Sequence, residues 1–309
     1  MPRRLTVKAY AKVNLCLSVG APITDGAHGG AGSGMHPIAS WMAAVDLYDE
    51  IELTELAQGD DTAWQIRWSD GRAIDWAVSD DLAVRAAAVL GAADRVGGRV
   101  TKSIPAGGGL GGGSSDAAAV LMAVNQLFDR GESVDELRRR SAALGSDIAF
   151  FVHEGEPGTP PPPALVSGLG DSIERMPALA GPITLICPPF GCPTGAVYRT
   201  FDARQSEVRH NEARENEAGR THAAVRTADV ARAARAGVLD DEVLFNDLAE
   251  PAFAVRPELA RIHERAERAA GRPVHVSGSG STLFVLGDVD AGAMAAACPG
   301  ARVVRTALI

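Results

Sequence analysis

The chain has 309 residues, of which 46% are hydrophobic and 22% charged, as is typical of a globular protein with a large core. Its formal net charge of −9 disfavours binding to nucleic acid or to a membrane surface, since both are negatively charged. The apolar runs are too short to cross a bilayer and no signal sequence is recognisable, so a cytoplasmic protein is expected.

The opening segment has the pattern of a β-strand. Residues 7–19 alternate between apolar and polar side chains, which predicts a strand with one buried and one polar face. The polar face carries Tyr10, Lys12 and Asn14, which are therefore expected to lie together. A loop rich in glycine and other small residues follows over 20–34.

Strand and helix patterns are mixed along the rest of the chain. Further strands are expected at 38–45, 49–56, 100–104, 183–187, 274–277, 282–286 and 302–306. Helices are expected at 79–90, 116–128, 243–253 and 257–270, and another should begin at a capping box of Ser133 and Glu136 and end near residue 144. This order predicts an α+β protein with two lobes, residues 1–165 and 166–309.

Two segments are predicted to be connectors. Residues 157–163 contain five prolines and should form a stiff surface link. Residues 202–240 are rich in Arg, Glu and Ala with few large apolar side chains, which predicts a solvated or flexible insertion.

The cysteines show neither a C-x-x-C pair nor the spacing of a zinc site. They are Cys16, Cys187, Cys192 and Cys298. Buried free thiols in a reducing compartment are therefore expected, and no metal site of cysteine and histidine is predicted.

A glycine-rich loop is the strongest chemical signal. The segment Ala106–Ser115 contains six glycines in ten residues and lies between an expected strand and an expected helix. Glycines let successive backbone N–H groups converge on an anion, and the start of the helix adds the positive end of its dipole. The hydroxyls of Ser114 and Ser115 could reach phosphate oxygens or Mg²⁺. The loop therefore predicts a nucleotide phosphate site.

Other interpretations of this loop fit less well. A flexible linker is not usually placed between a strand and a well-patterned helix, and a Walker A loop needs a lysine that is absent here. Gly107, Gly109 and Gly112 match the G-x-G-x-x-G dinucleotide pattern by letter. The acidic residue near the required distance, Asp129, lies at an expected helix end and not at the end of a second strand.

Three motifs in this order resemble the GHMP kinase superfamily. They are Ala11–Leu15, Pro105–Ala119 and Val276–Ser281. The resemblance is strongest to the branch that phosphorylates a cytidine diphosphate-linked polyol for isoprenoid synthesis by the non-mevalonate route. It rests on the form of the glycine-rich loop, with its two Gly-Gly-Gly runs followed by Ser-Ser-Asp, and on three further features. These are Leu144–Ile148, Asp25-Gly26 with His36, and Pro193-Thr194 with Tyr198. It implies a two-lobed α+β fold, with a ribosomal protein S5-like N-terminal domain and a ferredoxin-like C-terminal domain.

The resemblance also implies roles for individual residues, with ATP and Mg²⁺ as cofactors. Asp147 would accept the proton of the attacking hydroxyl, and Lys12 would orient that hydroxyl and offset charge on the phosphoryl group. The residues expected to bind ATP are Lys102, Pro105, Ala106, Gly107, Gly108, Gly109, Leu110, Gly111, Gly112, Gly113, Ser114 and Ser115, with Ser115 as the candidate Mg²⁺ contact. Those expected to bind the acceptor are Asn14, His36, Thr194, Tyr198, Gly278 and Ser279, with Tyr198 stacking on cytosine.

Several alternatives stay open. Met35 stands before His36 where the family usually has tyrosine, residues 27–34 are extra, and Asp81 replaces a common asparagine. Another GHMP kinase, acting on homoserine or a mevalonate derivative, is therefore a second hypothesis. A non-catalytic nucleotide-binding regulator is a third, although it predicts loss of the catalytic carboxylate or lysine. By residue chemistry alone, Asp147 could also be an ordinary ion pair or a helix cap, and Lys102 a solvated strand lysine.

Overall fold

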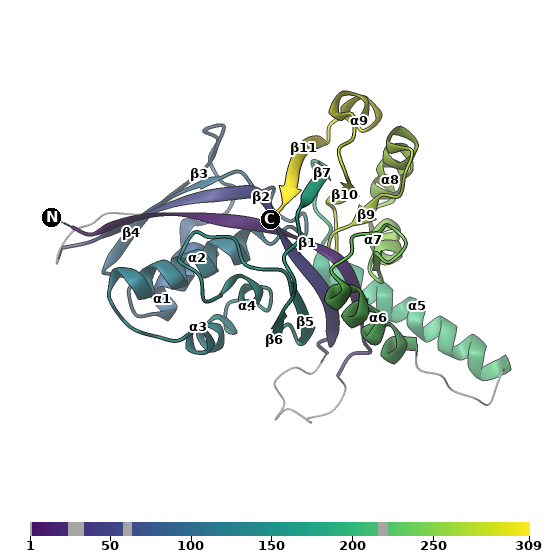
Figure 1. Ribbon diagram of the computed structural model, residues 1–309, viewed down its shortest axis with the longest axis horizontal. Helices are drawn as coiled ribbons and strands as arrows, with labels where there is room; N and C mark the ends of the chain where they lie inside the picture. The colour runs from purple at the N-terminus through teal and green to yellow at the C-terminus, as the bar shows by residue number, and fades with distance from the viewer. Residues whose placement is uncertain (1, 24–33, 58–63, 216–221) are drawn as a thin grey trace.

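The computed structural model describes residues 2–23, 34–57, 64–215 and 222–309. Two long antiparallel strands, β1 (Arg4–Val19) and β2 (Ile38–Glu55), run along much of the molecule (Figure 1). The other strands are β3 (Gln65–Trp68), β4 (Val96–Lys102), β5 (Ala164–Gly168), β6 (Ser172–Arg175), β7 (Gly181–Cys187), β8 (Phe245–Asn246), β9 (His275–Val276), β10 (Leu283–Leu286) and β11 (Arg302–Leu308). The two strands expected at 38–45 and 49–56 are thus one continuous strand, β2.

Strand β2 joins strands β3 and β4 on one side of the sheet to strands β11, β7, β10 and β9 on the other. The hydrogen-bonded order is β3-β4-β2-β11-β7-β10-β9, and β1 and β5 also pair with β2. Strand β11 is joined to β2 by the antiparallel pairing of Leu308 with Val45. Strand β5 spans the expected boundary between residues 165 and 166 and pairs with β2. The division into two domains at this boundary stays a prediction.

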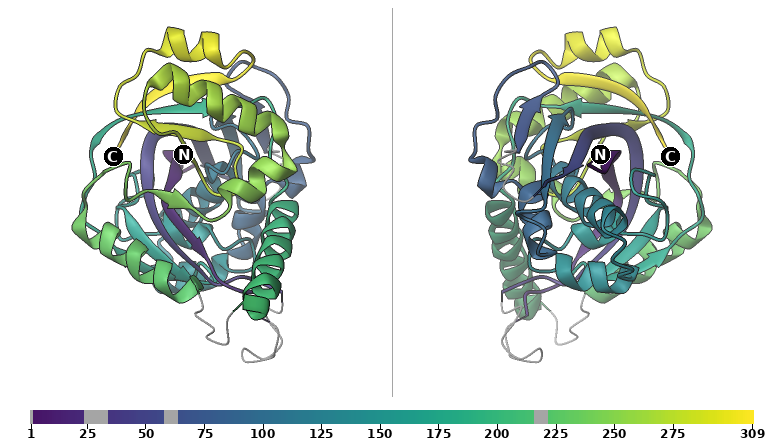
Figure 2. Two further views of the ribbon diagram at one scale, coloured as in Figure 1. Left: turned by 90° about the vertical axis from the view of Figure 1, so that its right-hand side faces the viewer. Right: turned by 90° about the vertical axis from the view of Figure 1, so that its left-hand side faces the viewer.

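The helices lie in two groups (Figures 1 and 2). The first group is the 3₁₀ helix Val78–Asp80, α1 (Leu82–Val89), α2 (Gly112–Leu127), α3 (Val134–Ser141) and α4 (Ile148–Phe151). The second group is α5 (Thr194–Glu215), α6 (His222–Ala236), α7 (Ala249–Val255), α8 (Pro257–Ala270) and α9 (Ala291–Ala297). Helix α2 is central to the first group, because most of its residues are buried in one apolar cluster with α1 and with β1, β2 and β4.

Local signals predicted some helix ends correctly. The capping box at the start of α3 is confirmed, since Ser133 and Glu136 each bond the backbone of the other. Helix α1 begins later than expected, because its N-cap is Asp81, whose carboxylate accepts the N–H of Ala83. Helix α2 begins at Gly112, inside the glycine-rich loop, and not at residue 116.

Strand β1 departs from the expected half-buried pattern. From Lys12 to Ser18 both faces are buried, and Lys12 and Asn14 are each 3% exposed. The polar side chains are covered by other segments of the chain: Lys12 lies beside Asp147, Asn14 bonds Ser40, and Ser18 bonds Asp247. The sequence of one strand cannot reveal this covering.

Helix α6 contradicts part of the expected insertion. Its residues Val230 and Ala234 are fully buried in a core cluster with residues of β1 and β2. The prediction of a solvated segment over 202–240 is therefore wrong for α6, because its small apolar face packs on the sheet. In Figure 2, α5 and α6 flank the ends of the long strands from two sides.

Between 243 and 253 a strand replaces part of the expected helix. Strand β8 pairs in parallel with β1 at Cys16 and Leu17, and helix α7 begins after it. The four cysteines are free and buried, as expected.

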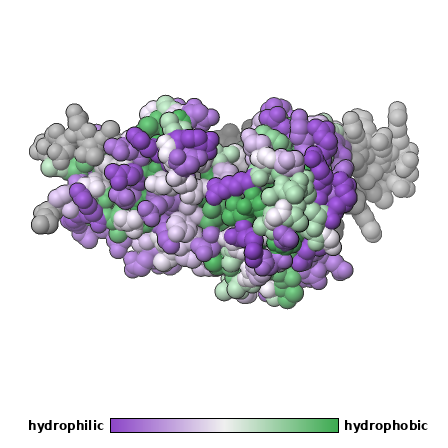
Figure 3. Space-filling model, turned by 90° about the horizontal axis from the view of Figure 1, so that it is seen from above, coloured by the Kyte–Doolittle hydropathy of each residue, from purple (hydrophilic) through white to green (hydrophobic). Residues whose placement is uncertain are grey.

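The outer surface is mostly polar when the molecule is seen from above, with an apolar area near the middle (Figure 3). Among the described residues, none of the helices combines the length and apolar character needed to cross a membrane.

Candidate active site

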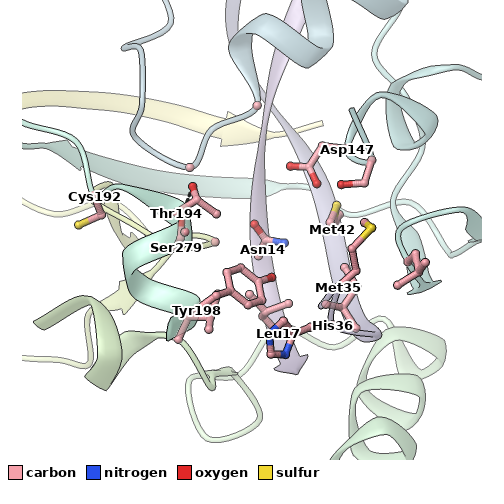
Figure 4. Close-up of a pocket in the computed structure, with 18 of the residues that line it drawn as sticks. Asn14, Leu17, Met35, His36, Met42, Asp147, Cys192, Thr194, Tyr198 and Ser279 are labelled. Atoms are coloured by element: carbon pink, nitrogen blue, oxygen red, sulfur yellow. Dashed lines mark hydrogen bonds between the residues drawn. The ribbon is translucent and has the colours of Figure 1, made fainter. Parts of the chain in front are cut away.

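A cavity of about 600 Å³ brings together most residues that the sequence singled out. Its walls come from β1, β2, the glycine-rich loop, the start of α5 and the loop after β9. The expected residues that line it are Lys12, Asn14, His36, Gly107, Gly109, Gly111, Asp147, Thr194, Tyr198, Gly278 and Ser279. In Figure 4, Asp147 lies toward one end of the cavity, His36 and Tyr198 lie toward the other, and Asn14 lies between them.

The three sequence motifs meet at the glycine-rich loop. The backbone N–H of Lys12 donates to the carbonyl of Leu110 over 2.9 Å, and that of Thr282 donates to the carbonyl of Gly108 over 3.0 Å. Ser277 Oγ donates to the carbonyl of Gly109 and accepts the N–H of Asn14, each over 3.2 Å. These bonds hold the loop in one position relative to β1 and to the third motif.

Two glycines in this loop are required by its geometry. Gly109 has φ +79°, and a Cβ there would lie 2.3 Å from the carbonyl oxygen of Ser277. Gly111 has φ +72° and is the N-cap of helix α2. The first-turn N–H groups of a helix have no partner within the helix, so this end can bind an anion. The conformation of the loop thus fits a nucleotide phosphate.

Lys12 and Asp147 form an ion pair in the cavity. The Lys12 Nζ atom lies 3.5 Å from Asp147 Oδ2, and the side chains are 3% and 37% exposed. Burial lowers the pKa of Lys12, and the nearby Asp147 carboxylate opposes this shift. Asp147 is the N-cap residue of α4, but its side chain makes no capping hydrogen bond. Its carboxylate is therefore available to the cavity.

A short hydrogen-bond chain orients Lys12. Its ammonium donates to Asn14 Oδ1, and Asn14 Nδ2 donates to Ser40 Oγ over 2.8 Å. Ser40 Oγ in turn donates to the carbonyl of Cys16 over 2.8 Å. The chain fixes the amide of Asn14 so that its oxygen faces the lysine. Ser40 was not identified from the sequence, where it is one polar residue within an apolar strand.

His36 and Tyr198 lie against each other. Their ring centroids are 4.9 Å apart with an interplanar angle of 45°. His36 Nδ1 lies 2.9 Å from the carbonyl of Gly20, and its Nε2 lies 3.4 Å from Asp202 Oδ2. Burial raises the pKa of Tyr198 to about 12, so its hydroxyl is neutral at neutral pH. The pair forms an aromatic wall with hydrogen-bonding edges, and the sequence had not pointed to Asp202.

The third motif is held by a residue that the sequence analysis missed. Asn246 Nδ2 donates to the carbonyls of Val276 and Gly278 over 2.8 and 2.7 Å. Ser279 Oγ lies 3.0 Å from Thr194 Oγ1 across the cavity wall. The available signal was the polar pair Asn246-Asp247 within an otherwise apolar stretch.

Lys102 lies in a buried charge cluster below the loop. Its Nζ is 2.8 Å from Asp49 Oδ2 and also contacts Asp116 Oδ2, and both carboxylates are fully buried. Burial disfavours the charged lysine, but the two carboxylates outweigh it and raise the pKa of Lys102. Burial also raises the pKa of Asp116 well above its usual range. The placement of Lys102 favours support of the loop, and its contact with nucleotide stays a prediction.

Asp49 connects this cluster to the entrance of the loop. Its Oδ1 accepts the N–H groups of Ser103 and Ile104, the latter over 2.8 Å. Because Asp116 belongs to α2, the cluster joins the strand before the loop to the helix after it. Asp116 Oδ1 is buried and has no hydrogen-bond partner among the described residues.

Other expected site residues lie in the loop or below it and do not line the cavity. They are Pro105, Ala106, Gly108, Leu110, Gly112, Gly113, Ser114 and Ser115. Ser115 is 2% exposed, whereas Ser114 is half-buried, which favours Ser114 for contact with a phosphate-bound ion. Asp25, Gly26 and residues 27–33 lie outside the described residues.

Known proteins resemble this chain over nearly its whole length. Residues 81–155 match the family model described as the GHMP kinases N terminal domain. The chain is 34% identical to a 4-diphosphocytidyl-2-C-methyl-D-erythritol kinase of Bacillus pumilus (strain SAFR-032), over 92% of this chain and 88% of that protein. It is also 34% identical to the protein of that name from Nocardioides sp. (strain ATCC BAA-499 / JS614), over 92% of this chain and 89% of that protein.

Solved structures agree with these matches. A crystal structure of 4-(cytidine 5'-diphospho)-2C-methyl-D-erythritol kinase has a TM-score of 0.69 and 27% identity, covering 98% of this chain and 99% of that one. Mevalonate kinase of L. major in complex with R-mevalonate has a TM-score of 0.62 and 16% identity, covering 99% and 96%, and shows likeness of fold alone. The expected α+β GHMP kinase fold is confirmed.

Proposed function

Because the chain belongs to the 4-diphosphocytidyl-2-C-methyl-D-erythritol kinases, we propose that it transfers the γ-phosphate of ATP to the 2-hydroxyl of that cytidine diphosphate-linked polyol. The product would serve isoprenoid precursor synthesis by the non-mevalonate route. The observation that carries the proposal is the Lys12–Asp147 pair, which faces the same cavity as the glycine-rich loop and the His36–Tyr198 wall.

The geometry supports a role for each end of the cavity. We propose that Asp147 accepts the proton of the attacking hydroxyl, since its carboxylate is partly exposed to the cavity and makes no helix cap. Lys12 would orient that hydroxyl and offset negative charge on the transferred group. His36 and Tyr198 would bind the cytosine by hydrogen bonding and stacking.

ATP supplies the phosphoryl group, and Mg²⁺ when bound neutralises part of its charge. We propose that the first turn of α2 and the amides of the glycine-rich loop bind the phosphates, because Gly109 and Gly111 hold backbone conformations suited to that contact. Protein sites for Mg²⁺ often supply one or two carboxylates, with phosphates completing the shell. Among the described residues, the half-buried hydroxyl of Ser114 is better placed than the buried Ser115 to contact an ion held by the phosphates. A cytoplasmic location and the two-domain division at residue 165 belong to the same proposal.

Steady-state release of ADP tests the proposed acceptor. The purified chain is assayed with 4-diphosphocytidyl-2-C-methyl-D-erythritol, with homoserine and with mevalonate, and the Asp147→Asn variant serves as the control for contaminating kinases. Turnover with the first acceptor alone is expected. Turnover with homoserine or mevalonate instead would contradict the proposed acceptor. Binding of ATP without turnover of any acceptor would favour a regulator.

A further inference from the structure

Among the described residues that line the cavity, one basic side chain pairs with no carboxylate. The basic residues of the cavity lining within the described chain are Lys12, His36 and Arg199, and the acidic ones are Asp147 and Asp202. Lys12 pairs with Asp147 at 3.5 Å, and His36 lies 3.4 Å from Asp202. Arg199 forms no ion pair with any described residue, although it is exposed on the cavity wall.

The position of Arg199 places its charge in the cavity. It follows Tyr198 on helix α5 and is one turn after Gly195, which also lines the cavity. A Cβ added to Gly195 would lie 3.4 Å from Arg199 Nη1, so the guanidinium lies over the first turn of α5. This turn contains Thr194, whose hydroxyl meets Ser279. The guanidinium therefore lies on the cavity wall beside the first turn of α5.

We propose that Arg199 binds the diphosphate of the acceptor and thereby selects a diphosphate-linked substrate, an inference that rests on the proposed function. A diphosphate carries two or more negative charges, and in this chain of net charge −9 the attraction must be local. The guanidinium can form two parallel hydrogen bonds to phosphate oxygens. Lys12 is not available for this role, because it is buried and already bound to Asp147 and Asn14.

Binding of CDP and CMP isolates the contribution of the second phosphate. Affinities are measured by calorimetry for the wild-type chain and for Arg199→Met, Arg199→Lys and Arg204→Met. Arg204 lies on the same helix, pairs with Glu250 at 3.5 Å and does not line the cavity, so it is a matched control. Thermal unfolding of each variant shows whether it is folded.

Arg199→Met should weaken CDP binding about 10-fold or more, because a charge-assisted hydrogen bond is lost, and should weaken CMP binding less. Arg199→Lys should retain part of the affinity, and Arg204→Met should bind as the wild type does. CDP affinity should fall with salt more steeply in the wild type than in Arg199→Met. In turnover, KM for the acceptor should rise while kcat and KM for ATP stay near the wild-type values.

Equal CDP affinity in the wild type and Arg199→Met would overturn the inference, as would equal losses for CDP and CMP or a rise confined to KM for ATP. If the wild-type chain turns over the acceptor, these outcomes reject the role of Arg199 and leave the proposed function standing. If the wild type neither binds CDP nor turns over the acceptor, the proposed function fails and the inference fails with it.

Discussion

Lys12 Nζ lies 3.5 Å from Asp147 Oδ2, yet the lysine side chain is 3% exposed and the aspartate side chain 37%. The two partners therefore differ in their solvation. The lysine loses most of its hydration on folding, while the carboxylate keeps contact with the cavity. This asymmetry fits a fixed cation and a carboxylate that can accept a proton from a substrate hydroxyl.

Asp147→Asn should abolish most of the activity without unfolding the chain. Asparagine has a similar size but cannot accept the proton, so kcat should fall about 100- to 10,000-fold. Release of ADP is measured at saturating acceptor, and the KM for ATP should change little. Retention of wild-type kcat would reject Asp147 as the proton acceptor.

Lys12→Met should lower activity and leave stability at neutral pH equal to or above that of the wild type. Because burial lowers the pKa of Lys12 below 10.5, the folded chain binds this proton less tightly than the unfolded chain. Charging Lys12 therefore costs folding energy below its folded pKa, and that cost disappears as the pH rises toward 10.5. Thermal unfolding and ADP release are compared at pH 7.

The same shift predicts how the wild-type activity depends on pH. The alkaline limb of the plot of activity against pH should begin below the pH at which an ordinary lysine loses its proton.

The stability of Lys12→Met has an outcome that would contradict the prediction. A clear drop of its thermal midpoint at pH 7 would show that the ion pair outweighs the desolvation of the lysine.

Gly109→Ala should be far more harmful than Gly131→Ala. Both glycines have positive φ, +79° and +68°, so each substitution carries backbone strain of about 1–2 kcal/mol. A Cβ at Gly109 also lies 2.3 Å from the Ser277 carbonyl oxygen, while nothing lies within 4 Å of one at Gly131. In urea unfolding, Gly109→Ala should lose more stability than Gly131→Ala, and the KM for ATP should rise in Gly109→Ala alone. Equal losses in the two variants would show that strain, and not the contact between the motifs, matters.

The buried cluster of Lys102, Asp49 and Asp116 should respond unequally to two substitutions. Lys102→Met leaves two buried carboxylates without a cation and should destabilise the chain by about 3–5 kcal/mol. Asp116→Asn removes one negative charge but keeps an oxygen for Lys102 and should stay within about 1 kcal/mol of the wild type.

The pH dependence of stability tests whether the pKa of the Asp116 carboxyl is raised in the folded chain. Because the folded pKa of Asp116 is raised above 3.8, the wild type should lose stability from this group as the pH rises from about that value toward the folded pKa. Asp116→Asn should remove this slope, as measured by urea unfolding across the pH range. A larger loss of unfolding free energy in Asp116→Asn than in Lys102→Met would contradict the conclusion that Lys102 is the cation that balances the two buried carboxylates.

Val230→Asp tests the packing of α6 on the sheet. Val230 is fully buried, so a charge there should cost about 3 kcal/mol or more of unfolding free energy. Arg232→Ala, on the same helix and with its side chain 78% exposed, should cost less than about 1 kcal/mol. Similar thermal midpoints for both variants would mean that α6 does not pack as described.

Local patterns predicted the elements near the site because their causes lie within a few residues. The Ser133–Glu136 capping box requires only neighbouring backbone groups, and the alternation of β1 follows from the pleat. The glycines at 107–113 indicated a phosphate loop, since their conformational freedom is intrinsic to the residue. The apolar pattern placed the start of α2 too late, because it contains no information on whether Gly112–Ser115 are helical.

Sequence alone determined the succession of strands and helices, the glycine-rich loop and the motifs that resemble a kinase family. Tertiary structure decided that Lys12 is buried beside Asp147, that Lys102 is enclosed by two carboxylates, and that Val230 of α6 belongs to the core. The physical reason is that conformational preference acts over a few residues, whereas desolvation and charge pairing depend on which distant segments cover a side chain.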